Sequence, residues 1–171
     1  MQLPLNTVTI DEVVAIAESF EASSAELYRH AATDCDRPEV RQTLLGLAEM
    51  EDNHLRALAE LRRLLARNPL AGRHAGREAE LLEAWLGREV FAPHGHPSEE
   101  GQRGKTVQGW LETAVGLEKE SIAFYSGMRS LLVERHRGVL DTIIEEEVYH
   151  LASLSYLLRT LRCGHLPGPL A

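Results

Sequence analysis

Cysteine pairs and long apolar runs are both missing from this chain of 171 residues. Its two cysteines, Cys35 and Cys163, lie far apart and form no CxxC pair, so one chain cannot build a thiolate zinc site or a rubredoxin-type iron site. Any metal here must therefore bind to carboxylates and imidazoles. No apolar run reaches the roughly 18 to 20 residues that a membrane helix needs, because charged residues interrupt every candidate segment.

An excess of positive charge is also missing. The chain has 18 Lys and Arg against 26 Asp and Glu, a formal charge of −8, and no basic patch that could outweigh it. We therefore expect no nucleic-acid partner. The opening segment MQLPLNTVTIDE has no basic region followed by an apolar stretch, which argues against a cleaved signal peptide. The expectation is a single domain over residues 1–171, located in the cytoplasm and not bound to a membrane.

Four segments have the three-four spacing of apolar residues that is typical of amphipathic helices, and none alternates like a strand. The predicted fold class is therefore all-α. The expected helices run from near Thr9 to before Thr33–Arg37, from Pro38 to about Arg67, from near Thr106 to around Gly138, and onward to about Cys163. Short links within each pair predict two antiparallel hairpins. The connection over 68–105 is long enough to cross the bundle and is predicted to contain a short helix over 78–90.

Polar residues interrupt the predicted apolar seam of every helix. A heptad seam contains six of them: Glu21, Glu51, His54, Glu118, Glu147 and His150. Two seam tyrosines, Tyr28 and Tyr125, each follow a glutamate by seven residues. The second half repeats the first at an offset of 96 or 97 residues, which indicates an internal duplication.

Antiparallel hairpins bring the helix middles to one level, so four carboxylates share a small apolar volume. A buried unpaired carboxylate costs several kcal/mol, and like charges repel one another. Two divalent cations relieve both costs, so the pattern predicts a metal site. The alternative is that the seam is misregistered and that these residues lie on solvated helix faces. Glu49, Glu145 and Glu146 fall outside the seam and are assigned to solvated faces.

On these residues the sequence resembles the ferritin-like superfamily of di-iron carboxylate proteins, and within it the rubrerythrin-like group. The resemblance covers all four helices and implies a ferritin-like four-helix bundle of two hairpins joined by a long crossover. It also implies two iron ions, for which manganese or zinc can substitute. By analogy with the family, Glu51 and Glu147 are bridging ligands, and Glu21 and Glu118 are terminal ligands. His54 and His150 each complete the ligand set of one metal ion.

The resemblance implies a non-haem di-iron oxidoreductase that reduces hydrogen peroxide or dioxygen. Tyr28 and Tyr125 are candidate catalytic residues that donate hydrogen bonds to the bound oxygen species or to a ligand carboxylate. They can equally be core tyrosines with satisfied hydroxyl groups. There are two alternatives. One is a ferroxidase in iron handling, and the other is a non-redox bundle that buffers metal or is stabilised by it.

Two departures limit the resemblance to rubrerythrins. The chain lacks the cysteines of a rubredoxin domain, so its electrons must come from an external donor such as a separate rubredoxin. Ser121 stands where rubrerythrins carry an extra glutamate, which makes the site closer to the six-ligand pattern of ferritins and bacterioferritins. Only Gly164–Ala171 follow the fourth helix, too few residues for the short fifth helix of ferritins. We therefore expect a homodimer rather than a hollow cage.

Overall fold

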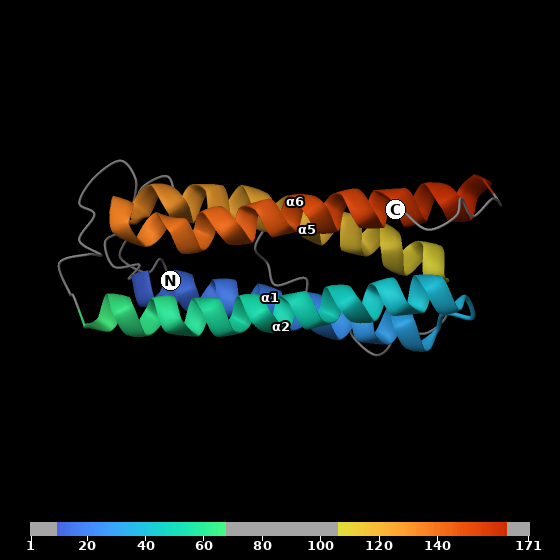
Figure 1. The fold of residues 1–171 in the computed structure, drawn as a ribbon, viewed down its shortest axis with the longest axis horizontal. Helices are drawn as coiled ribbons and strands as arrows, with labels where there is room; N and C mark the ends of the chain where they lie inside the picture. Colours follow the sequence, from blue (N-terminus) through green and yellow to red (C-terminus); the bar gives the residue numbers. More distant parts are fainter. Residues whose placement is uncertain (1–9, 68–105, 164–171) are drawn as a thin grey trace, which may run out of the picture.

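Four long helices make up the described part of the chain. The computed structural model describes residues 10–67 and 106–163, which form α1 (Ile10–Thr33), α2 (Pro38–Ala66), α5 (Val107–Leu131) and α6 (Glu134–Cys163) (Figure 1). This result confirms the all-α fold class. The predicted crossover over 68–105, with its short helix, lies outside the described residues. None of the four helices combines the length and apolar character needed to span a membrane.

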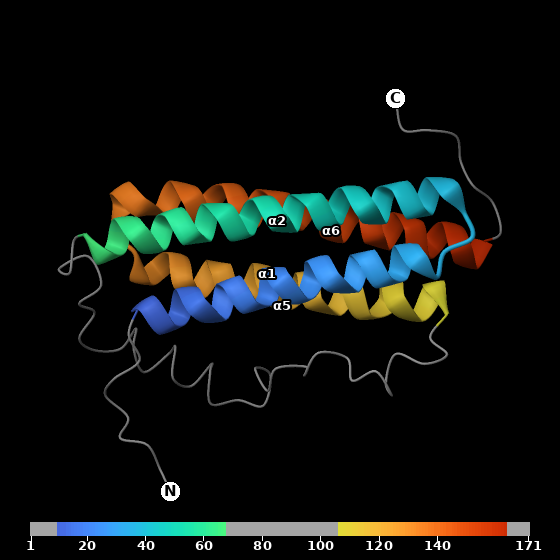
Figure 2. The same cartoon turned by 90° about the horizontal axis from the view of Figure 1, so that it is seen from below.

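The helices pack as two antiparallel hairpins, as predicted. α1 packs along α2, and α5 packs along α6 (Figure 1). The turned view in Figure 2 shows how the hairpins meet, with α1 beside α5 and α2 beside α6. Each helix therefore contacts its hairpin partner and one helix of the other hairpin, so side chains from all four can meet along the bundle axis.

The ends of the helices follow local sequence signals. Pro38 opens α2 in the first turn, where its missing N–H group has no intrahelical partner to lose. The Thr106 side chain caps α5 by accepting a hydrogen bond from the backbone N–H of Gly109 at 3.2 Å. Between α1 and α2, the Arg41 guanidinium donates to the carbonyl oxygen of Ala32, in the last turn of α1, at 3.2 Å and to that of Cys35 at 2.6 Å. These contacts satisfy backbone groups that a helix end leaves unpaired.

The turn of the second hairpin lies earlier than the sequence predicted. α5 ends at Leu131 rather than around Gly138, because Leu132 adopts an extended conformation (φ −89°, ψ 143°) and α6 starts at Glu134. Glycine commonly ends a helix, yet Gly138 lies inside α6. Leu131 and Leu132 are both buried, so the apolar spacing continues across the break and hides it. The Arg137 side chain closes the turn by donating to the carbonyl oxygen of Leu132 at 2.9 Å.

Two apolar clusters fill the bundle on either side of its middle. One contains Val13, Val14, Ala17, Leu58, Leu61, Leu65, Phe124, Tyr125, Met128, Leu131, Leu132, Leu140 and Ile143. The other contains Leu27, Tyr28, Ala31, Ala32, Cys35, Val40, Leu44, Leu47, Ala48, Trp110, Leu111, Ala114, Leu154 and Leu157. The polar residues predicted to lie on the seam come from the stretches between these clusters.

Candidate metal centre

The six predicted ligands meet at the middle of the bundle. Each is at most 2% exposed: Glu21, Glu51, His54, Glu118, Glu147 and His150. α1 and α5 each supply one glutamate, and α2 and α6 each supply a glutamate and a histidine one turn apart. The seam register was therefore right for all six, and the alternative of solvated helix faces is excluded for them.

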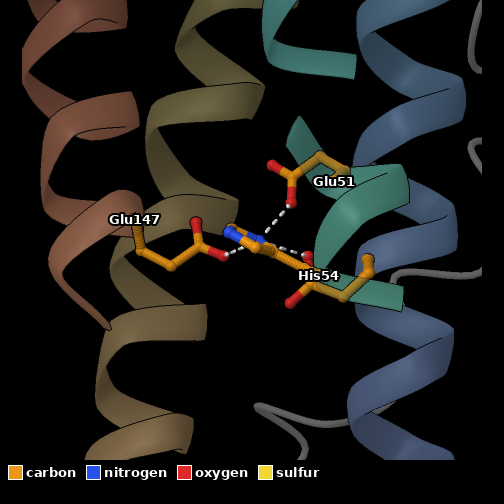
Figure 3. A group of neighbouring side chains, drawn as sticks. Glu51, His54 and Glu147 are labelled. Atoms are coloured by element: carbon orange, nitrogen blue, oxygen red, sulfur yellow. Dashed lines mark hydrogen bonds and ion pairs between the residues drawn. The ribbon is translucent and has the colours of Figure 1, made fainter. Parts of the chain in front are cut away.

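The inner nitrogen of His54 faces three carboxylates. Its Nδ1 lies 3.1 Å from Oε2 of Glu51, 3.3 Å from Oε2 of Glu21 and 3.1 Å from Oε1 of Glu147. Figure 3 shows the His54 ring between Glu51 of its own helix and Glu147 of α6. The first position thus takes three ligands from the first hairpin and one from the second.

His150 faces a matching set of carboxylates. Its Nδ1 lies 3.2 Å from Oε1 of Glu51, 3.4 Å from Oε2 of Glu147 and 3.8 Å from Oε1 of Glu118. The second position therefore takes three ligands from the second hairpin and one from the first.

Glu51 and Glu147 belong to both positions. Each directs one carboxylate oxygen toward His54 and the other toward His150. The ligand atoms of each four-residue group lie within 4.8 Å of one another, which is close enough to surround one cation. Two adjacent four-residue groups that share two carboxylates are a donor set for a pair of metal ions.

The hydrogen bonding of the cluster also fits a metal pair. Among the described residues, Oε1 of Glu51, both carboxylate oxygens of Glu147 and both ring nitrogens of His150 have no hydrogen-bond partner. A buried polar atom without a partner is costly, and one proton on Nδ1 of His54 cannot serve three carboxylates. Two divalent cations would give these atoms ligand bonds instead.

Burial and crowding of charge shift the pKa values of the glutamates in opposite directions. Burial raises the pKa of Glu21 and Glu118 well above that of an ordinary glutamate, and the nearby carboxylates of Glu51 and Glu147 add to the rise. Burial would also raise the pKa of Glu51 and Glu147, but the neighbouring glutamate (Glu21 or Glu118, respectively) and the two histidines outweigh it and lower both. Among the four glutamates, the outer pair therefore holds protons more readily than the inner pair.

The nearby carboxylates raise the pKa of both histidines. Burial alone would lower the pKa of His54, but the carboxylates of Glu147, Glu21 and Glu51 outweigh it and raise that pKa strongly. The pKa of His150 rises to about 9 despite burial, because of Glu147 and Glu51. The carboxylates of the cluster therefore favour the protonated form of both imidazole rings.

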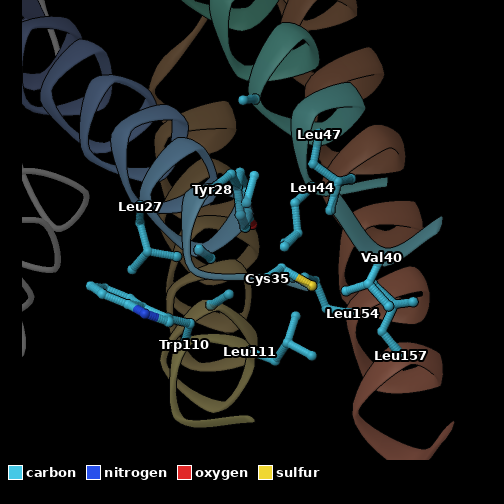
Figure 4. Close-up of a cluster of buried hydrophobic side chains, with 14 residues drawn as sticks. Leu27, Tyr28, Cys35, Val40, Leu44, Leu47, Trp110, Leu111, Leu154 and Leu157 are labelled. Carbon is cyan, nitrogen blue, oxygen red and sulfur yellow. The ribbon is translucent and has the colours of Figure 1, made fainter. Parts of the chain in front are cut away.

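The two tyrosines cross between the hairpins. The Tyr28 hydroxyl donates to Oε1 of Glu118, and the Tyr125 hydroxyl donates to Oε1 of Glu21. Tyr28 also borders the apolar cluster at the α1–α2 turn, where Figure 4 shows it beside Leu44. Burial, followed by the charge of Glu21, raises the pKa of Tyr125 well above its ordinary value, which keeps its hydroxyl protonated as a donor. Both hydroxyls thus have carboxylate acceptors, which agrees with one of the two predicted acceptors and with the alternative of core tyrosines whose hydroxyl groups are satisfied.

Sequence reasoning missed one residue of the site. Glu146, assigned above to a solvated face, accepts a hydrogen bond from Nε2 of His54 at 2.7 Å through its Oε2. Its side chain is 42% exposed, so it reaches the histidine from the edge of the bundle. Glu49 and Glu145 are exposed, as expected. The sequence contained one indication of this role, because Glu146 directly precedes Glu147 on the helix beside His54.

Comparison with known proteins supports the fold. No family model and no curated protein matches the sequence. The structure is similar to a crystal structure from Thermotoga maritima, whose description proposes a ferritin-like diiron-carboxylate protein. The two chains are 21% identical, the match covers 89% of this chain and 95% of the other, and the TM-score is 0.72. The chain therefore has a ferritin-like four-helix bundle fold, with a buried carboxylate–histidine cluster at its centre.

Proposed function

We propose that this chain is a non-haem di-iron oxidoreductase that reduces hydrogen peroxide or dioxygen, as rubrerythrin-like peroxidases do. The observation that carries the proposal is the pair of four-residue groups that share Glu51 and Glu147. Each position offers three carboxylates and one imidazole, ligand types that iron accepts. The description of the Thermotoga protein with the same fold supports iron over manganese or zinc, which can use the same donors.

The side chains have distinct roles in this proposal. When bound, two iron ions supply the two electrons that reduction of peroxide or dioxygen requires. Glu51 and Glu147 hold the two positions at a fixed separation, because each has one oxygen in each group. Tyr28 and Tyr125 hold protons at their hydroxyl oxygens, beside the outer carboxylates. The apolar clusters above and below restrict water and so strengthen these polar contacts.

We assign the return of electrons to a separate protein. The two cysteines cannot form the four-thiolate site of a rubredoxin, so a separate rubredoxin is the kind of donor proposed.

Ferroxidase activity is the second candidate. Ser121 is buried, and it belongs to neither four-residue group, so the site has no seventh carboxylate at that position. A symmetric six-ligand site suits an enzyme that takes up Fe(II) and passes on Fe(III). Both candidates use the same pair of metal ions, but they differ in how Fe(II) is restored to the site. The peroxidase needs an external reductant, whereas the ferroxidase takes up new Fe(II).

Metal counting tests the shared part of the proposal. After anaerobic loading with Fe(II) and desalting, plasma mass spectrometry should find about two iron ions per wild-type chain. The double variant Glu51→Ala, Glu147→Ala should retain none. A matched control, Glu49→Ala with Glu145→Ala, removes two exposed carboxylates at the same 96-residue offset and should bind like wild type. Two bound ions in the Glu51, Glu147 variant would show that these residues do not form the centre.

Kinetics then separates the candidates. A peroxidase oxidises its loaded iron faster with hydrogen peroxide than with dioxygen, and turns over only when an external reductant is supplied. A ferroxidase instead keeps consuming added Fe(II) beyond the first two ions, without reductant. If neither oxidant changes the iron absorption spectrum, the metals are structural and both redox proposals are wrong.

A further inference from the structure

The two halves of the centre differ at the outer nitrogens of the histidines. Nε2 of His54 lies 2.7 Å from Oε2 of Glu146. Nε2 of His150 is buried and, within the described ranges, has no hydrogen-bond partner. The ligands themselves are matched between the halves, so this contact is a clear asymmetry of the site.

The asymmetry has a simple origin in the sequence. Glu146 directly precedes the ligand Glu147 on α6, the helix beside α2. The residue that directly precedes the matching ligand Glu51 on α2 is Met50. Both side chains are half-buried, so the two positions have similar surroundings. A methionine thioether accepts hydrogen bonds only weakly, so Met50 cannot replace a carboxylate.

A carboxylate on the outer nitrogen prepares a histidine to bind metal. It accepts the Nε2–H, which fixes the tautomer in which the Nδ1 lone pair points toward the metal, and it orients the ring. Nδ1 of His54 faces the group formed with Glu21 and the two shared glutamates, so this tautomer would present its lone pair to a metal held there. The ring of His150 has no such partner among the described residues, so it must be oriented and fixed as a tautomer when the metal binds.

We propose that Glu146 is a positioning residue that makes the two metal positions unequal. The position at His54 takes the first divalent cation and holds it more tightly than the position at His150. This inference rests on the proposed function, because it assumes that the cluster binds two metal ions. It goes beyond that function in assigning an order of filling and a residue that sets it.

Anaerobic titration of the metal-free chain with Co(II) tests the proposal, with binding followed by visible absorption and calorimetry. Wild type should bind in two resolved steps. Glu146→Leu should weaken the tight step by about 10–100-fold, the usual effect of removing such an outer partner, and leave the other step unchanged. Glu146→Gln should stay close to wild type, because its amide oxygen accepts the same hydrogen bond. Glu145→Ala removes an equal charge from the exposed neighbouring residue and should change neither step.

Three further variants locate the effect. In a His150→Ala background, one ion should still bind and should still weaken with Glu146→Leu. In a His54→Ala background, Glu146→Leu should have no effect. Met50→Glu should strengthen the weak step of the otherwise wild-type chain, because it supplies the carboxylate that His150 lacks.

The possible failures are distinct. Two equal steps in wild type, or equal weakening of both steps by Glu146→Leu, overturns the proposed order while leaving the metal pair intact. A wild-type chain that binds fewer than two Co(II) ions overturns the di-metal centre itself. Circular dichroism of each variant shows that the helices are retained in either case.

Discussion

The hydroxyl of Tyr125 on α5 donates a hydrogen bond to the carboxylate of Glu21 on α1, in the opposite hairpin. Tyr28 on α1 donates to Glu118 on α5 in the reverse direction. The two contacts hold the outer glutamates from across the bundle. They also join the hairpins at the level of the candidate metal centre.

Removal of the Tyr125 hydroxyl should destabilise the metal-free fold. Tyr125→Phe leaves a buried oxygen of Glu21 without its donor, so the free energy of unfolding should fall by about 1–3 kcal/mol. Urea denaturation measures the change. Tyr149→Phe is the matched control, because Tyr149 is 61% exposed and the substitution retains its ring against His150. Equal stability of Tyr125→Phe and wild type would mean that the hydroxyl contributes nothing to the fold.

Outer and inner glutamates should differ in how many metal ions their loss removes. Glu21→Ala removes a ligand from one position only, so about one tightly bound ion per chain should remain. Glu51→Ala removes a ligand from both positions, so both ions should be lost. Metal analysis after desalting distinguishes these results. Loss of a single ion from Glu51→Ala would contradict its place in both groups.

Metal binding should release protons and strengthen as the pH rises. The pKa values of Glu21, Glu118 and His54 are raised, and that of His150 is about 9, so protons compete with a metal for these ligand atoms. We expect metal binding to release protons, with about one fewer released as the pH passes 9 and His150 is already neutral.

Calorimetry in buffers with different ionisation enthalpies measures this release directly. The metal affinity should increase with pH because protons compete with the metal for the ligand atoms. Fewer protons are bound to these atoms at higher pH, so the competition weakens. A metal affinity that is constant between mildly acidic and mildly basic pH would contradict the raised pKa values of the cluster.

Metal removal should lower the melting temperature. A ligand at about 100 times its dissociation constant stabilises the folded state by about 2.7 kcal/mol per site. For a chain of this size, two such sites correspond to a rise of roughly 10 °C or more in melting temperature. Differential scanning calorimetry with and without Co(II) measures it. The variant Glu51→Ala, Glu147→Ala should show no metal-dependent rise, and an equal rise there would place the bound metal elsewhere.

Helical periodicity was enough to predict the fold and the convergence of six polar side chains. A charged residue on an apolar seam is conspicuous, and the internal repeat supplied a second copy of each signal, as with Glu51 and Glu147. Periodicity could not find Glu146, because its backbone position is off the seam and only the length of its side chain brings the carboxylate to His54.

The partner of each tyrosine and the end of α5 depended on tertiary structure. Tyr125 was correctly placed on the seam, but its acceptor lies 104 residues away and is fixed only by the packing of α1 against α5. The break after Leu131 has no glycine or proline to mark it, since it is closed by burial of Leu132 and a hydrogen bond from Arg137. Contacts of this kind leave no local pattern in the sequence.

The difference between Met50 and Glu146 also bears on how such a bundle can evolve. Two copies of one hairpin that associate about a twofold axis must carry the same residue at both of these positions, so their two metal ions have identical surroundings. A fused chain has no such constraint, because each half can mutate separately. A single chain of this kind can therefore hold two different metal positions in one centre, which a symmetric pair of identical hairpins cannot do.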